Sequence, residues 1–411
     1  MSDETNTGPA DPNLSVGERI KFFRTRRGMS REVLGGLVGK SARWVKAVET
    51  GQMQQPKLPT LISLAEVLRV QDIGQLTGGQ AMPVSLFRGP GHRSLPEVRD
   101  AINAVGVPAN GPRSPLPHLQ ARLDSAWRAR HAAPDHRTVL GTLLPDLIRD
   151  AKHATRTYEG PERRQAFAVL AGVFNLAQFY LAYQPDSGLL WRAAERAVMA
   201  AEESEDPKAF GDAVWGLAQA HRDAGDFDAA EAVNREALEV LRPGIGDAAD
   251  ALRGTWGALH FEMGFTAARA GQQGTAWRWW EQADLIARTL PAEHYDLMTS
   301  FGRTIMPAHA VTIAVELRQR AEGIRQANRS VNAPILSRPR RGRHLIEVAR
   351  AWHLGGDPAA VLGTLQRAYS AAPETARYNG YCRRMVLDLT EGPAVLRQDA
   401  HDLAERVGLL V

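Results

Sequence analysis

The residues of this sequence best suited to contact a phosphate or a nucleic-acid base lie near its N-terminus, between Lys40 and Lys46. Arg43 can donate two hydrogen bonds to a guanine edge, and Trp44 can pack on a thymine methyl group or on a sugar. The cations of Lys40 and Lys46 suit phosphate oxygens. The full set of candidates for contact with a nucleic acid is Arg24, Arg31, Lys40, Ser41, Arg43, Trp44, Lys46 and Ala47.

These side chains require a short helix that holds them on one outer face. Apolar spacing and glycines predict five short helical segments, at residues 16–27, 30–38, 41–50, 60–68 and 72–76. In the third segment, which Ser41 caps, Val45 and Val48 face the core. The outer face then carries Arg43, Trp44, Lys46 and Ala47. Two helices joined by a glycine-containing turn, the second of them basic, are typical of a helix-turn-helix unit.

Positive charge is concentrated in this module, although the 411-residue chain has a formal net charge of only +4. Residues 15–75 hold eleven Lys or Arg against five Asp or Glu, whereas residues 81–411 are close to neutral. A compact basic module suits phosphate neutralisation. The residues alone leave two alternatives open. A basic helical module can also dock a protein, and Trp44 can be buried instead of facing the groove.

The module resembles the helix-turn-helix of the Xre/Cro-repressor type. The matching positions are Arg19-Ile20 and Arg24, Met29-Ser30-Arg31 and Leu34, Gly39 and Ser41, Val48-Glu49 and Gly51, and the fourth segment at residues 61–68. The resemblance implies binding to double-stranded DNA. One departure is Gly35-Gly36, where the family prefers alanine or a longer residue. Each internal glycine costs about 0.5–1 kcal/mol relative to alanine, so we expect that these two permit close helix packing.

The rest of the chain divides into three further parts. Residues 1–14 are polar, lack the features of a signal peptide and are expected to be a disordered N-terminus in front of the helix-turn-helix domain at residues 15–78. A connector rich in Pro and Gly is expected at residues 79–114, with one helix at 96–104. Residues 115–411 show helical spacing throughout, including a stretch at 294–328, and the Arg-rich run at 338–343 is expected to be an exposed loop.

The helical part contains degenerate repeats. Residues 209–242 resemble a tetratricopeptide repeat, with Leu217-Ala218 in a packed first helix, His221 in the usual aromatic position and Gly225 at the turn. Weaker pairs occur at residues 176–197, 263–283 and 348–373. The predicted fold class is therefore all-α, with a five-helix helix-turn-helix domain followed by a tetratricopeptide-like right-handed α-solenoid.

First helices of such repeats line a concave face, which can hold a peptide or a small molecule. By the repeat register this face should carry Asn175, Gln178, Asp212, Trp215, Gln219, Arg222, Phe261, Phe265, Arg269, Arg343, Arg350 and His353. Each of these side chains has an alternative role as a solvated or internally paired group. The Arg-rich run has an alternative role too, because it can bind an acidic partner or a nucleic acid.

The whole arrangement resembles large actinobacterial Xre-type regulators and the peptide-sensing quorum regulators of Gram-positive bacteria. The stretch 301–317 and the tail at 404–409 also look like the actinobacterial members, and His309 within that stretch is a further candidate for ligand contact. The resemblance implies a transcriptional regulator that binds an inverted repeat as a homodimer and senses a signalling peptide or small-molecule ligand. The alternative is an adaptor whose repeats dock a partner such as a sigma factor or a toxin, with DNA binding secondary.

Other function classes lack their residue patterns. The sequence has no glycine-rich phosphate loop, no His-Glu-x-x-His, no cysteine pair for zinc and no Gly-x-Ser-x-Gly, so we expect neither an enzyme nor a metal or cofactor. The single cysteine, Cys382, is expected to be a buried, inert thiol in a reducing compartment. No apolar run approaches the ~20 residues that span a bilayer. A cytoplasmic location is expected.

Overall fold

The computed structural model describes residues 14–53, 56, 58–70, 72–77, 91–105, 114–330 and 334–409. All regular elements in these ranges are helices. The first domain comprises α1 (Val16–Arg26), α2 (Arg31–Leu37), α3 (Ala42–Glu49), α4 (Leu58–Val67) and α5 (Gly74–Thr77). The helices α7 (Leu95–Asn103), α8 (Leu116–Ala132) and α9 (His136–Thr157) follow.

Antiparallel helix pairs make up most of the remainder. They are α10 (Gly160–Leu181) with α11 (Ser187–Ser204), α12 (Pro207–Ala224) with α13 (Phe227–Leu241), α14 (Asp250–Arg269) with α15 (Gln273–Thr289), α16 (Met306–Glu316) with α17 (Arg320–Ser330), and α18 (Arg338–Gly355) with α19 (Pro358–Ala371). Three helices end the described chain: α20 (Pro373–Tyr378), α21 (Gly380–Thr390) and α22 (Arg397–Arg406). The predicted all-α fold, a helix-turn-helix domain followed by a tetratricopeptide-like solenoid, is confirmed.

The helices of the first domain begin where serine can cap them. The hydroxyls of Ser15, Ser30 and Ser41 accept hydrogen bonds from backbone N–H groups in the first turns of α1, α2 and α3. Ile20, Leu34 and Val45 lie in one shared apolar core with residues of α4 and α5. This small core fixes the angle between α2 and α3, which decides what α3 can present to a partner.

Small residues let the paired helices of the repeats approach each other closely. Ala193, Ala230, Ala276 and Ala368 are completely buried in the second helices of four pairs. At Gly257 of α14, an added Cβ would lie only 2.2 Å from the Phe301 ring. The predicted aromatic role of His221 agrees with its ring, which lies 4.7 Å from that of Trp191 in the preceding pair. Stacked pairs therefore bury one continuous core from α7 to α16, and the later helices share separate cores.

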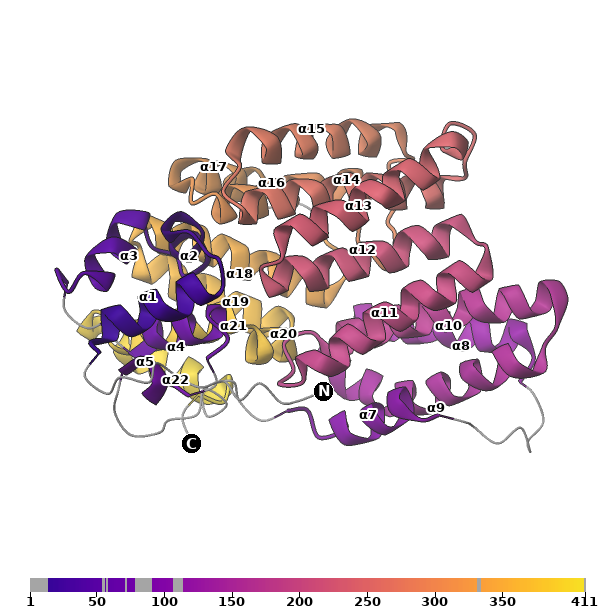
Figure 1. The fold of residues 1–411 in the computed structure, drawn as a ribbon, viewed down its shortest axis with the longest axis horizontal. Helices are drawn as coiled ribbons and strands as arrows, with labels where there is room; N and C mark the ends of the chain where they lie inside the picture. The colour runs from indigo at the N-terminus through magenta and orange to yellow at the C-terminus, as the bar shows by residue number, and fades with distance from the viewer. Residues whose placement is uncertain are drawn as a thin grey trace.

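The C-terminal helices α18 and α20 pack against α8 and α9, the first helices of the repeat domain (Figure 1). Helix α18 packs against α8. The Glu374 carboxylate, from α20, accepts hydrogen bonds from the backbone N–H of Arg137 at 2.5 Å and the Thr138 hydroxyl at 2.8 Å, so it caps the N-terminus of α9. The solenoid is thereby closed by contacts between its two ends.

The first domain docks against the C-terminal helices and the end of α12, where Arg69 donates to the Ala224 carbonyl at 3.1 Å, rather than against α7–α9 (Figure 1). Arg318, between α16 and α17, donates to the backbone carbonyl of Gly39 at 2.7 Å. Arg384 of α21 lies 3.3 Å from the Glu66 carboxylate of α4, and Leu387 packs on the core of the first domain. The turn between α2 and α3 is thus in direct contact with the repeat domain.

Two sequence predictions about the repeats are wrong. The Arg-rich run is not a loop: α18 begins at Arg338, the Ser337 hydroxyl caps it by accepting from the backbone N–H of Arg340, and Pro339 lies in its first turn. The predicted helical stretch at 294–328 begins irregularly: the Asp296 carboxylate accepts from the backbone N–H of Met298 and Thr299, which holds a non-helical turn before α16.

The connector is described only in part. Its predicted helix at 96–104 is confirmed as α7, whereas residues 79–90 and 106–113 lie outside the described residues, as does the predicted disordered segment except Leu14. No helix in the described ranges is long and apolar enough to cross a membrane.

Candidate nucleic-acid interface and the inner surface of the repeats

Helix α3 presents polar side chains on the face opposite its core residues. Val45 and Val48 are buried, whereas Arg43 and Lys46 are exposed. The Ser41 hydroxyl accepts from the backbone N–H of Trp44 at 3.1 Å and caps the helix. The helix therefore carries exposed cations on a rigid, capped scaffold, which is the arrangement that major-groove reading requires.

Trp44 and its neighbours take intermediate positions. The indole is half-buried against the core of the first domain, with the Lys40 ammonium 5.7 Å from its ring centroid. Ala47 is also half-buried. Trp44 is thus neither fully buried nor fully exposed to a DNA groove: its ring packs inward, and part of its surface stays accessible beside Lys40.

Two predicted phosphate contacts have internal partners. Arg24 is buried and donates from Nε and Nη2 to the two oxygens of the Glu49 carboxylate. Arg31 is partly exposed and donates to Glu49 at 2.7 Å. Burial alone would raise the pKa of Glu49, but the hydrogen bonds from Arg24 and Arg31 hold it below its usual value. In this conformation Arg24 holds α1 to α3 and is not available to a phosphate.

Gly35 allows the tight turn between α2 and α3. An added Cβ would lie 2.8 Å from the backbone oxygen of Lys40, whereas nothing lies within 4 Å of a Cβ added at Gly36. The expected role of the glycine pair in close packing is thus carried by Gly35. Gly36 has no such contact among the described residues.

The predicted residues of α10 and α12, except Gln219, are buried. Asn175 and Gln178 bond to each other, with Gln178 Nε2 donating to Asn175 Oδ1 at 3.2 Å. The Asp212 carboxylate lies 2.6 Å from the Lys208 ammonium and accepts from the Thr255 hydroxyl at 2.7 Å. These polar groups are internally paired. Gln219 is half-buried and Trp215 is nine-tenths buried.

An ion-pair network joins first helices of successive repeats. Glu316 of α16 lies 3.6 Å from Arg269 of α14 and 2.7 Å from Arg350 of α18. Glu347 accepts from Arg350 at 2.6 Å and from Arg343 at 3.0 Å. Burial alone would raise the pKa of Glu316, but Arg350 and Arg269 lower it to about 2. The network therefore ties α14, α16 and α18 together with alternating charges.

Aromatic rings lie beside these cations. The Arg222 guanidinium, ion-paired with Glu262, lies 3.9 Å from the Phe265 ring centroid. The His309 ring lies 3.7 Å from that of Phe261. His353 lies apart from the others: it is exposed, 3.8 Å from Asp388, on the side where Lys40 of the first domain acts on its charge. It belongs to the junction between the domains.

Sequence reasoning missed several residues near this inner surface. Arg130, at the end of α8, lies outside any recognised repeat, and Arg340 lies in the run expected to be a loop. Arg340 donates to His309 Nδ1 at 3.1 Å, and the Arg130 guanidinium lies 4.1 Å from the Phe179 ring centroid. A helix-start pattern, Ser337 followed by Pro339, was the available signal for Arg340.

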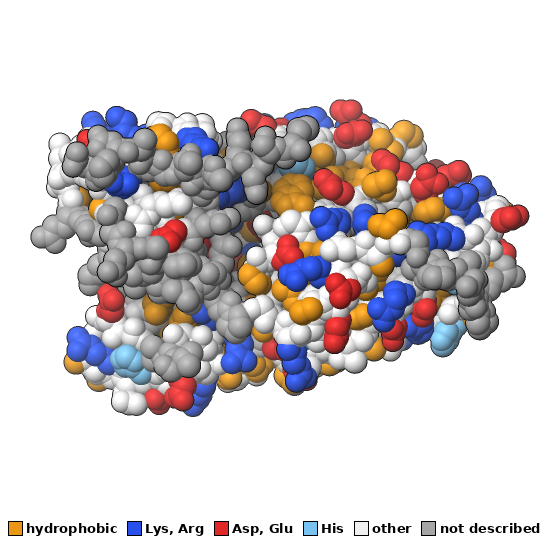
Figure 2. Space-filling view, turned by 60° about the horizontal axis from the view of Figure 1, so that its bottom comes forward, with side chains coloured by type: hydrophobic (Ala, Val, Ile, Leu, Met, Phe, Trp, Pro, Cys, Tyr) orange, Lys and Arg blue, Asp and Glu red, His pale blue; other side chains and the backbone are white. Residues whose placement is uncertain are grey.

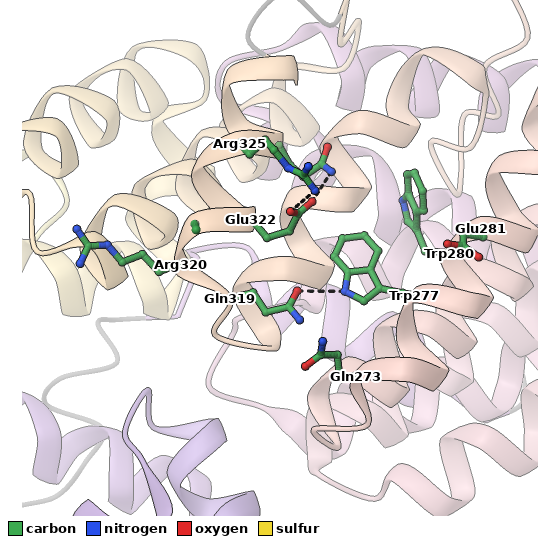
Figure 3. Close-up of a pocket in the computed structure, with 10 residues that line it drawn as sticks. Gln273, Trp277, Trp280, Glu281, Gln319, Arg320, Glu322 and Arg325 are labelled. Carbon is green, nitrogen blue, oxygen red and sulfur yellow. Dashed lines mark hydrogen bonds and ion pairs between the residues drawn. The ribbon is translucent and has the colours of Figure 1, made fainter.

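The outer surface also carries a pocket, of about 710 Å³, between α15 and α17. Trp277 and Trp280 line it, with their ring centroids 5.7 Å apart, and Trp277 Nε1 donates to Gln319 at 3.1 Å (Figure 3). The Glu322–Arg325 pair faces the two rings from α17 (Figure 3). The sequence did not single out this pocket.

Charge on the described repeat surface is mixed. On the face seen in Figure 2, the N-terminal end of the solenoid, on the right of the view, carries Lys and Arg interspersed with Asp and Glu. That part of the face has no extended region of one sign, in contrast to the basic composition of the first domain.

Comparison with known proteins supports the assignment of the first domain. Residues 15–74 match the family model HTH_31, a helix-turn-helix domain, so the N-terminal domain is a helix-turn-helix domain. A comparison with curated proteins gives no match.

Solved structures are similar at low sequence identity. A Rap protein complexed with competence and sporulation factor has 12% identity and a TM-score of 0.44, over 72% of this chain and 88% of that chain. Bacillus thuringiensis PlcR, in complex with the peptide PapR7 and DNA, has 10% identity and a TM-score of 0.34, over 96% and 99%. BtubC from P. vanneervenii has 11% identity and a TM-score of 0.38, over 62% and 91%.

Proposed function

We propose that this protein is a ligand-responsive transcriptional regulator that binds double-stranded DNA through α3. The observation that carries the proposal is the exposed pair Arg43 and Lys46 on a serine-capped helix, within residues that match a helix-turn-helix family model. Arg43 reads a base edge in the major groove, and Lys46 contacts a phosphate. Lys40 and Ser41, just before the first residue of α3, contact the sugar-phosphate backbone of the DNA.

The protein acts as a homodimer on an inverted repeat. Two helix-turn-helix units related by a two-fold axis place their recognition helices about 34–36 Å apart, one helical turn of DNA, so operator symmetry mirrors protein symmetry. The repeat domain supplies the dimer contact. It is a non-catalytic, cytoplasmic protein in this proposal.

The repeat domain senses a peptide or a small molecule on its inner surface. Its docking to the first domain through Arg318 and Arg384 gives a route by which a change in solenoid shape alters the position of α3. Coupling of this kind is typically worth about 1–3 kcal/mol.

A second candidate function is the docking of a partner protein such as a sigma factor or a toxin. The observation that favours it is the pocket between α15 and α17, because half-exposed tryptophans next to charged groups are frequent at protein interfaces. DNA binding is then secondary.

Selection of bound fragments from random DNA by the full-length protein tests the first function. We expect an enriched inverted repeat, bound at moderate salt with two chains per site by light scattering. Enrichment of no sequence at moderate salt contradicts it. Stoichiometric capture of one protein, lost on Trp277→Ala, together with no enriched sequence, favours the second function.

A further inference from the structure

Arg130 is a buried cation with an unused hydrogen-bonding edge. It is 9% exposed, its guanidinium stacks on the Phe179 ring at 4.1 Å, and its Nη1 contacts His131 Nδ1 at 3.4 Å. Its Nε is buried without a partner, and its one hydrogen bond among the described residues uses Nη1, which leaves the Nε–Nη2 edge unused. The Nε–Nη2 edge of arginine is the edge that accepts a carboxylate in two parallel hydrogen bonds.

A second buried donor lies around the same phenyl ring. The Trp215 ring centroid is 6.1 Å from that of Phe179, and Trp215 is 8% exposed. Its Nε1 is buried without a partner among the described residues. Burial of an unsatisfied donor is costly, so an acceptor that reached both of these donors beside the Phe179 ring would be stabilised there.

Arg340 adds a second cation without a counterion. It forms no ion pair with any residue that the structure describes, and its Nη2 donates to His309, whose pKa is kept low by burial and by Arg340 itself. The Tyr295 phenol acts on the charges of both Arg130 and Arg340, and its ring centroid lies 6.2 Å from that of His131, the neighbour of Arg130. We call Arg130, Phe179, Trp215, Tyr295 and Arg340 the Arg130 cluster.

The carboxylates near the cluster are already satisfied. Asp296, whose charge acts on His131, lies 3.2 Å from the Lys208 ammonium and accepts from the backbone N–H of Thr299 at 2.7 Å. Burial lowers the pKa of both Arg130 and Arg340 to about 10, and burial followed by Arg130 lowers the pKa of His131 to about 4. The cluster is therefore an uncompensated positive region inside the repeats.

We propose that the Arg130 cluster binds the carboxylate of an organic anion, with the carboxylate on the Nε–Nη2 edge of Arg130 and the apolar part of the ligand against Phe179, Trp215 and Tyr295. This inference rests on the proposed sensing function and names the chemical class of its ligand. A planar acceptor with two oxygens fits the arginine edge, and the aromatic rings favour an apolar body. A free carboxylic acid and the C-terminal carboxylate of a peptide share this chemistry.

The test uses matched probes that differ only in charge. Binding of benzoate and benzamide, and of N-acetylphenylalanine and its amide, is measured on the full-length protein by calorimetry and thermal shift, without DNA. We expect each carboxylate, and neither amide, to bind and to raise the melting temperature. A stronger response to N-acetylphenylalanine than to benzoate assigns a peptide terminus, and the reverse order assigns a free acid.

The variants separate the ligand role from a structural one. Arg130→Met keeps the volume and removes the uncompensated charge, so we expect loss of carboxylate binding with an equal or higher melting temperature of the free protein. Trp215→Phe keeps a ring but removes the donor and should weaken binding about tenfold, the effect of one lost hydrogen bond. The control Arg128→Gln removes an exposed charge from the same helix and should change neither quantity.

Equal responses to carboxylate and amide in the wild type, no carboxylate binding at millimolar concentrations, or full binding by Arg130→Met would each overturn the assignment. A lower melting temperature of Arg130→Met with unchanged binding would show a structural role instead. Because these measurements contain no DNA, their failure leaves the DNA-binding proposal intact. If the carboxylate binds but leaves the affinity for the operator unchanged, the proposed sensing function is contradicted, whereas the proposed binding site is supported.

Discussion

Arg31 Nε donates to the Glu49 carboxylate at 2.7 Å and so joins the first turn of α2 to the last residue of α3. The Glu49 side chain is fully buried, and Arg24 of α1 holds its other oxygen. One carboxylate of the recognition helix therefore sets the positions of α1 and α2 relative to it.

Glu49→Gln should destabilise the helix-turn-helix domain by about 3 kcal/mol, because removal of one partner leaves buried arginine charge without compensation. The folded pKa of Glu49 is below its usual value of 4.5, so this stabilisation exists above pH 4.5 and is lost as the pH falls through the folded pKa. Hydrogen exchange of α1–α3 in the full chain measures it. The exposed Glu32→Gln serves as the control, and equal exchange in both variants would contradict the role of Glu49.

Gly35→Ala and Gly36→Ala should have opposite effects on stability. The first forces a Cβ against the Lys40 carbonyl and should cost about 1–3 kcal/mol, whereas the second meets nothing and should gain about 0.5–1 kcal/mol from helix propensity. Urea unfolding followed by hydrogen exchange of α2 measures both. A gain in stability for Gly35→Ala would show that the close approach at Gly35 is unimportant.

Arg43→Ala should reduce affinity for the selected operator by about 1–3 kcal/mol and relax specificity at one base pair. Lys46→Ala should weaken binding to all sequences and lower the salt dependence by about one ion. Gel shifts over a salt series separate the two effects, with the exposed Lys21→Ala of α1 as the control. A variant Arg43→Ala with wild-type specificity would exclude α3 as the base-reading helix.

Arg318→Ala should loosen the junction between the domains. The lost hydrogen bond to Gly39 is worth about 0.5–1.5 kcal/mol, so hydrogen exchange should accelerate at residues 37–42 while the repeats stay protected. The neighbouring exposed Arg320→Ala is the control. Unchanged exchange in this turn would mean that the docking depends on Arg69, Arg384 and Leu387 instead.

The sequence predicted the elements better than their contacts. The helices of the first domain, α7 and the repeat pairs follow from serine caps, turn glycines and small residues, which act locally. The pairing of Arg24 with Glu49 and of Glu316 with Arg269 and Arg350 joins separate helices, and a single sequence does not reveal which cation meets which carboxylate. For the Arg-rich run, the high charge predicts an exposed loop, whereas the helix-start signal at Ser337 determines the structure that forms.

The inner surface shows the same limit. Register placed Trp215, Arg343 and Arg350 inward, but closure of the solenoid brings in Arg130 from α8, which no repeat pattern includes. Residues that gather through closure of a ring can be found only when the ring is known. The first domain lacks this difficulty, because its face is formed by one helix.

The Glu374 cap on α9 has a consequence for synthesis of the chain. Glu374 and Thr138 are 236 residues apart in the sequence. The N-terminus of α9 is therefore uncapped during synthesis of the chain, while the intervening helix pairs leave the ribosome and fold as local hairpins. The contact between α20 and α9 forms only after α20 has been synthesised. The first domain, although it is synthesised first, gains its contacts with α21 later still. A chain that ends before α20 would keep its helical hairpins, but the N-terminus of α9 would lack its cap and the first domain would lose its contacts with α21.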